Sequence, residues 1–179
     1  MTGGAAPSRR HLLALGVAAA WLAPGRVRAA AGRERSLALR SLHTGERVVA
    51  VYWADGGVVA EGLAAIERVL RDHRTGEAHA IDRALLDLLV ALRTALDTRA
   101  EYEIISGYRS PRSNALLVRA TSGVARDSLH VRGMAIDVRL PGRPLRAVRD
   151  AAASLRAGGV GFYPASGFVH IDVGRVRYW

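Results

Sequence analysis

Hydrophobic and polar residues alternate along the chain with two different periods, which predicts both strands and helices. Alternation with a period of two predicts strands over residues 36–42 and 47–53, joined by a polar hairpin loop. Apolar residues spaced three and four apart predict helices over residues 60–72 and 82–96. Asp82 is placed to cap the second of these helices.

The second half of the chain mixes the two periods. The predicted elements are a strand over 102–106, a short helix beginning at Pro111, a loop over 121–133, a strand over 134–140, a helix over 144–157 ended by Gly158 and Gly159, and short strands from 160 onward. Regular βαβ repeats are absent from this order. It therefore favours an α+β fold, in which helices pack on an antiparallel sheet within a single domain.

The first residues have the pattern of an export signal. Arg9 and Arg10 precede an apolar stretch over 12–22, and small residues follow up to Ala29. This predicts an export signal over residues 1–29, with the paired arginines indicating the twin-arginine route. The stretch is shorter than the roughly 20 residues of a membrane span. We therefore expect a periplasmic domain over residues 30–179 without a stable membrane span, the alternative being an uncleaved interfacial anchor.

Composition narrows the possible chemistry. The chain has no cysteine, which excludes a thiolate nucleophile or a thiolate metal ligand. Its formal net charge is +10, of which four arginines belong to the predicted signal. The positive charge that remains in the rest of the chain suits binding to an acidic polymer, such as nucleic acid or the carboxylate-bearing cell wall. Because the basic residues are scattered and an export signal precedes them, the cell wall is favoured and nucleic acid is not expected.

Two predicted strands carry polar residues on one face and apolar residues on the other. Asp137 lies on the face opposite Ile136 in the first strand, and His170 lies on the face opposite Ile171 in the second. With His130 upstream, two imidazoles and one carboxylate would complete a three-ligand zinc site that leaves the fourth position for water. On spacing alone, hydrogen-bonded or surface histidines are the alternative.

Three local sequences resemble one family of enzymes. Ser128-x-His130-x2-Gly133-x-Ala135-x-Asp137 resembles a motif of the zinc D-Ala-D-Ala carboxypeptidase and murein endopeptidase family. The segment 105–111 with Asn114, and the segment 168–172, resemble two further elements of that family. Similar stretches near both ends of the predicted domain are most like its murein endopeptidase K branch. The resemblance covers the whole domain, with the motifs in the family's order.

The resemblance implies a role for each of several residues. His130, Asp137 and His170 would bind Zn²⁺ as the cofactor. Arg109 would be catalytic, by stabilising a developing oxyanion or gripping a substrate carboxylate, with a loop-holding ion pair as the alternative. Ser128 would bind substrate or hold His130, or would serve only as a turn residue.

Two further positions leave alternatives open. Tyr108 would line the substrate cleft, or pack as an ordinary aromatic residue. Many relatives have an acidic general base three positions before the last ligand, but this chain has Gly167 there. Asp172 shares the predicted face of His170, so it is the candidate catalytic base. Its alternative role is to orient the imidazole.

The resemblance implies a zinc metallopeptidase that hydrolyses peptidoglycan peptides. Hydrolysis of crosslinks or stem peptides by an endopeptidase is favoured. A carboxypeptidase and a non-catalytic, zinc-containing wall-binding module are the alternatives. Peptidoglycan peptides are the expected partner, and we expect a monomer.

Overall fold

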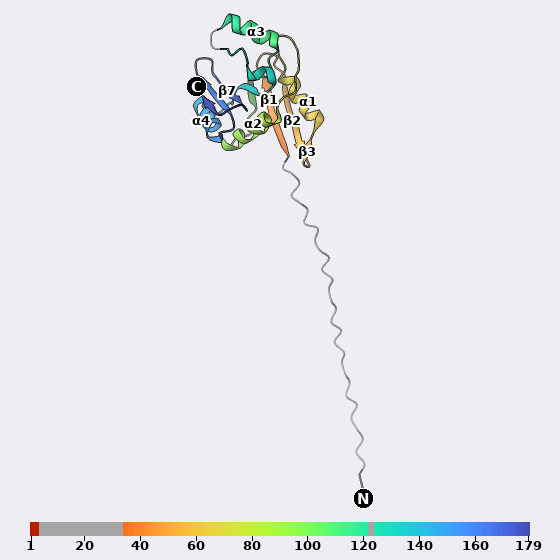
Figure 1. The fold of residues 1–179 in the computed structure, drawn as a ribbon. Coiled ribbons are helices and arrows are strands. Elements are labelled where there is room, and N and C mark those ends of the chain that lie inside the picture. Colours follow the sequence, from red (N-terminus) through yellow and green to blue (C-terminus); the bar gives the residue numbers. More distant parts are fainter. Residues whose placement is uncertain (4–33, 122–123) are drawn as a thin grey trace.

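The computed structural model describes residues 1–3, 34–121 and 124–179 of the chain (Figure 1). Apart from its first three residues, the predicted export signal lies outside the described residues. Within the described ranges, no helix combines the length and apolar character needed to cross a membrane.

The described residues form one α+β domain with eight strands, four α-helices and one short 3-10 helix. The strands are β1 (Arg35–Ser41), β2 (Arg47–Ala54), β3 (Gly57–Val58), β4 (Tyr102–Ser106), β5 (Ala135–Arg139), β6 (Gly159–Tyr163), β7 (Phe168–Asp172) and β8 (Arg177–Tyr178). The helices are α1 (Ala60–Val69), α2 (Arg83–Ala95), α3 (Pro111–Ala120), α4 (Leu145–Leu155) and the 3-10 helix η1 (Leu129–Arg132). The α+β prediction is confirmed, and η1 lies inside the segment predicted as a loop.

All eight strands form a single sheet in the order β3-β2-β1-β4-β5-β7-β6-β8. Most neighbours are antiparallel, but β1 pairs parallel with β4, and β6 pairs parallel with β8. The predicted antiparallel pairing holds for most of the sheet, and the two parallel pairs make it a mixed sheet. Parallel neighbours need a long connection. The chain between β1 and β4 supplies one, because it contains β2, β3, α1 and α2.

A hydrophobic core lies between the sheet and the helices. Helices α2 and α4 contact each other and the sheet, and lie at the lower side of the domain in Figure 1. Leu85, Leu89 and Leu92 of α2 are fully buried in this core. Asp82 caps α2 as predicted, because its carboxylate accepts a hydrogen bond from the N–H of Ala84 (2.8 Å).

Helix α3 differs from the others. It lies at the top of the domain in Figure 1, and its buried residues are the polar Ser113 and Asn114. Ser110 caps it by accepting a hydrogen bond from Ser113 N (3.2 Å). The buried side of α3 therefore packs against the polar segment that precedes the helix, and not against the hydrophobic core.

Strands β5 and β7 have the two faces that their sequences predict. Ile136, Val138, Val169 and Ile171 belong to the hydrophobic core. Residues between them point to the other face of the sheet. The polar positions of β5 and β7 therefore lie on the side of the sheet away from the core.

Candidate metal centre

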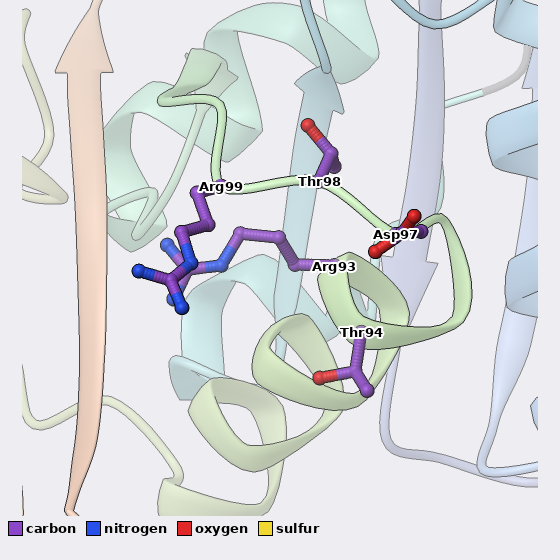
Figure 2. Close-up of a pocket in the computed structure, with 5 residues that line it drawn as sticks. All are labelled: Arg93, Thr94, Asp97, Thr98 and Arg99. Carbon is purple, nitrogen blue, oxygen red and sulfur yellow. The ribbon is translucent and has the colours of Figure 1, made fainter.

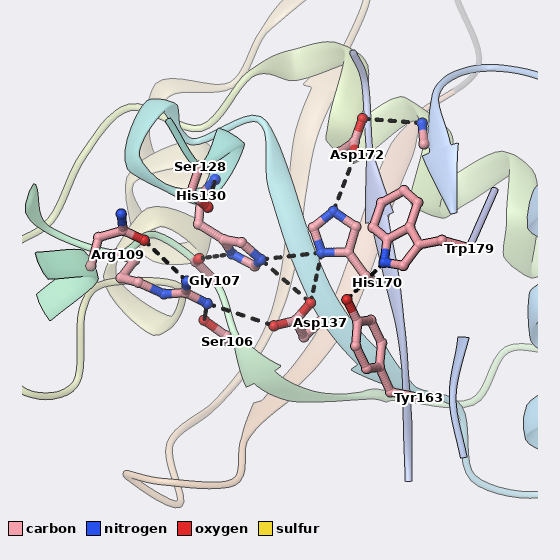
Figure 3. Close-up of polar contacts among 12 residues, drawn as sticks. Ser106, Gly107, Arg109, Ser128, His130, Asp137, Tyr163, His170, Asp172 and Trp179 are labelled. Carbon is pink, nitrogen blue, oxygen red and sulfur yellow. Dashed lines mark hydrogen bonds and ion pairs between the residues drawn. The ribbon is translucent and has the colours of Figure 1, made fainter. Parts of the chain in front are cut away.

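Three side chains from separate elements converge on the polar face of the sheet (Figure 3). Asp137 of β5 is directly opposite His170 of β7 in the antiparallel register, and His130 comes from η1. Asp137 Oδ1 lies 2.9 Å from His170 Nδ1 and 3.4 Å from His130 Nε2. The two imidazole nitrogens are 3.3 Å apart. One oxygen and two nitrogens thus form a compact triangle.

The size of this triangle fits a tetrahedral zinc ion. With metal–ligand distances of about 2.0–2.1 Å, two ligands of a tetrahedral ion lie roughly 3.3–3.4 Å apart. Two edges of the triangle have this length, and the edge between Asp137 and His170 is shorter. All three side chains are buried or nearly so. Because the group has two imidazoles and one carboxylate, it matches a catalytic zinc set with one open position.

Hydrogen bonds on the far side of each imidazole direct a lone pair into the triangle. His130 Nδ1 lies 2.7 Å from the carbonyl oxygen of Gly107, which can only accept, so this nitrogen carries the proton. His170 has a carboxylate at each ring nitrogen, with Nε2 3.0 Å from Asp172 Oδ2 and Nδ1 2.9 Å from Asp137 Oδ1. With an ion held in the triangle, the proton of His170 would lie on Nε2, and the nitrogens that face Asp137 would each offer a lone pair to the ion. Such outer partners commonly hold metal-binding histidines in their tautomer.

Asp172 is fully buried beside His170, on the side away from the triangle. Its Oδ1 accepts hydrogen bonds from the N–H groups of Gly159 (3.1 Å) and Gly174 (2.8 Å). Arg177 donates to both carboxylate oxygens, at 3.1 and 2.7 Å. Burial by itself would raise the pKa of Asp172, but the hydrogen bonds from His170, Gly174 and Arg177 hold it well below its usual value. Because its pKa is low and both of its oxygens already accept hydrogen bonds, Asp172 is better suited to orient His170 than to accept a proton.

Arg109 lies on the opposite side of the triangle from Asp172 (Figure 3). Its Nη2 is 3.9 Å from Asp137 Oδ2 and donates to Ser106 Oγ at 3.4 Å, and its Nη1 donates to Asn114 Oδ1 at 3.3 Å. The Nε atom is buried and has no hydrogen-bond partner among the described residues. Burial lowers the pKa of Arg109, although Asp137 opposes this effect. An arginine side chain stays charged under these conditions.

The two predicted substrate-binding residues both make contacts within the protein. Ser128 caps η1, and its hydroxyl accepts a hydrogen bond from the backbone N–H of His130 (3.4 Å). Tyr108 is buried, stacks on His79 with ring centroids 4.7 Å apart, and donates its backbone N–H to Leu70 O (2.7 Å). Both contacts are structural, so substrate binding by these residues stays a prediction.

The sequence patterns assigned no role to several residues that adjoin His170. The indole ring of Trp179 lies 5.3 Å from the His170 ring, and its N–H donates to the hydroxyl of Tyr163 (2.7 Å). Arg177 links Asp172 to this indole, with its guanidinium 4.8 Å from the ring centre. The similarity of residues 174–179 to the family was the only signal for Arg177 and Trp179, and Tyr163 had none.

A surface hollow elsewhere on the domain is separate from this centre. It is lined by Arg93, Thr94, Asp97, Thr98 and Arg99, at the C-terminal end of α2 (Figure 2). None of the residues predicted for the site lies there. The convergent side chains of the candidate centre therefore lie apart from this hollow.

Comparison with known proteins agrees with the geometry. The family model described as "Peptidoglycan L,D-endopeptidase MepK", of the M15 peptidases, matches residues 29–179. The chain is 43% identical over 176 residues to the peptidoglycan L,D-endopeptidase MepK of Escherichia coli K12, covering 96% of this chain and 97% of the relative. It is 42% identical over 148 residues to the probable peptidoglycan L,D-endopeptidase MepK of Haemophilus influenzae, covering 82% and 80%. No solved structure matches it. The chain therefore belongs to the MepK family of M15 peptidases.

Proposed function

We propose that this protein is a zinc-dependent peptidoglycan endopeptidase that hydrolyses an amide bond between residues of L and D configuration. The names of its relatives support the substrate class and the bond type. The observation that carries the proposal is the triangle of Asp137 Oδ1, His130 Nε2 and His170 Nδ1, with edges of 2.9 to 3.4 Å. Water adds to the amide, which yields a free carboxylate and a free amine.

Each side chain of the centre has a distinct task in this proposal. His130, Asp137 and His170 hold the ion, and zinc bound there would lower the pKa of water and polarise the amide carbonyl. Asp172 holds the His170 ring in its metal-binding tautomer. Arg109, which is fixed in position and charged, stabilises the negative charge that develops on the carbonyl oxygen.

Two neighbouring residues complete the proposed site. Ser128 holds η1, and with it His130, through the backbone hydrogen bond at 3.4 Å. Tyr108 forms part of the cleft wall on the Arg109 side. The chain is exported to the periplasm by its N-terminal signal and acts there as a monomer.

A non-catalytic wall-binding module is the second candidate. It is favoured by Gly167, which leaves no acidic side chain at the position that serves as general base in many relatives. In the described part of the chain, the carboxylates that contact the two imidazoles are Asp137 and Asp172. Asp137 is assigned to the metal and Asp172 to orientation, so hydrolysis by this site needs another group for proton transfer.

Digestion of crosslinked muropeptides by the purified, zinc-loaded protein tests the proposal. Cleavage should give monomeric products, and their masses identify the bond that is cut. His130→Ala should abolish both zinc binding and cleavage, while His43→Ala, at an exposed histidine outside the centre, should change neither. Loss of a single terminal residue would indicate a carboxypeptidase. Full zinc loading without any cleavage would indicate a binding module.

A further inference from the structure

Aromatic side chains border the candidate centre on its His170 side. Trp179 and Tyr163 are joined by the indole hydrogen bond of 2.7 Å, and Tyr163 stacks on Phe168 with ring centroids 4.7 Å apart. Figure 3 shows the indole beside the His170 ring, with Arg109 on the other side of the triangle. The centre therefore has a cationic side and an aromatic side.

Backbone pairing fixes Trp179 in this place. Its N–H donates to Val160 O (3.2 Å), and its carbonyl accepts from Phe162 N (2.9 Å), so it continues the pairing of β8 with β6. Gly161 lies directly opposite His170 in the register of β6 and β7. A Cβ atom at Gly161 would lie 2.6 Å from Trp179 Cε2, so the indole occupies the space that the glycine leaves.

Trp179 is held rigidly and is nevertheless 49% exposed. An exposed indole forgoes the stabilisation that burial of its apolar surface would provide. Tryptophan and tyrosine side chains with fixed positions offer a large contact area at a small entropic cost, which makes them frequent anchors for ligands. The place of Trp179, next to a metal-binding imidazole, suits contact with a substrate that reaches the ion.

We propose that Trp179 and Tyr163 form a subsite that binds the aliphatic part of the substrate residue on the His170 side of the scissile amide. This inference rests on the proposed peptidase function. The apolar ring face selects methylene or methyl groups, whereas Arg109 on the other side selects carboxylate or carbonyl oxygens. Because the two sides differ in chemistry, the substrate binds in one direction across the ion.

Steady-state kinetics on crosslinked muropeptides tests the subsite. Trp179→Ala should raise KM roughly tenfold, equivalent to about 1.4 kcal/mol, with little change in kcat or zinc content. Trp179→Phe keeps an aromatic face and should recover most of this loss. Tyr178→Ala is the matched control, because Tyr178 is the neighbouring residue, is 52% exposed and donates its hydroxyl to Ala153 O of α4.

Several results would overturn the subsite. One is a KM for Trp179→Ala equal to that of the wild type. Another is that Trp179→Ala loses bound zinc, folded structure and kcat together, which would show that the indole only holds His170 in place. Failure of Trp179→Phe to improve on Trp179→Ala would also count against an aromatic contact.

Fluorescence gives a measurement that does not depend on cleavage. The chain has three tryptophans, so replacing Trp21 and Trp53 by phenylalanine leaves Trp179 as the only indole. With His130→Ala added to prevent hydrolysis, muropeptide should change the emission in a saturable way, and a flat titration would contradict the subsite. If this titration succeeds but the zinc-loaded wild type cleaves nothing, the peptidase proposal fails and the subsite remains.

Discussion

Replacing Asp172 by asparagine would remove one charge from the centre while keeping the shape of the side chain. Every group that contacts the carboxylate is an N–H donor: Gly159 N and Gly174 N on Oδ1, His170 Nε2 on Oδ2, and Arg177 on both. An amide has one NH₂ group, so either orientation places a donor against a donor. If the NH₂ faces His170, the ring must carry its proton on Nδ1, which blocks the metal position.

The expected cost follows from these contacts. Loss of a carboxylate that orients a metal-binding histidine weakens metal affinity by about 10- to 100-fold, which corresponds to roughly 1.4–2.8 kcal/mol. One charge-assisted hydrogen bond is also lost in a fully buried place, so the free energy of unfolding should fall by about 1.5–3 kcal/mol. Asp172→Asn should therefore bind zinc weakly yet cleave substrate once excess zinc is supplied.

Competition with a chromophoric chelator near neutral pH would measure the zinc affinity. Urea unfolding and muropeptide cleavage would be followed on the same samples. Asp150→Asn is the matched control, because this carboxylate lies on α4, is 61% exposed and pairs with Arg149. Unchanged zinc affinity with a collapsed kcat would refute the orienting role and identify Asp172 as the general base.

Three further variants test other parts of the structure. Arg109→Gln should lower kcat by roughly 10²- to 10³-fold with full zinc content, and a wild-type rate would contradict its role in stabilising the oxyanion. Asp72→Asn should destabilise the protein by about 1–3 kcal/mol at neutral pH, because the pKa of this buried carboxyl is lowered, despite its burial, by nearby hydroxyl and backbone N–H groups. That difference, measured by urea unfolding, should shrink as the pH falls below the unfolded-state pKa of about 3.9 and towards the lower native value; a difference independent of pH would oppose this account. Gly62→Ala should cost about 1–3 kcal/mol because its Cβ would collide with Val51 O and push α1 off β2, whereas Gly57→Ala, with Ala54 O at 3.9 Å as its nearest neighbour, should be close to neutral.

Local periodicity predicted the strands of the centre and the direction of their side chains. Alternation placed Asp137 and His170 on polar faces, because side chains on a strand point alternately to its two sides. It could not show that these residues lie directly opposite each other, because strand order depends on packing between distant segments. For the same reason the parallel pairing of β1 with β4 was missed.

The remaining residues of the centre depend on contacts that no local pattern contains. The motif singled out His130, but the acceptor of its Nδ1–H is Gly107, more than 20 residues away in sequence. The face of Asp172 was predicted correctly, but its contact with the outer nitrogen of His170 emerges only in three dimensions. Trp179 reaches the centre because Gly161 has no side chain, a relation between two strands that sequence spacing does not reveal.

Two of the three proposed ligands, Asp137 and His170, lie on neighbouring strands, and the hydrogen-bonded pairing of β5 with β7 sets the distance between them. Their spacing therefore exists before any ion arrives, and only His130 depends on a short helical turn for its approach. Removal of the ion with a chelator should leave the domain folded and able to bind zinc again. Small zinc domains, in contrast, unfold when their metal is removed.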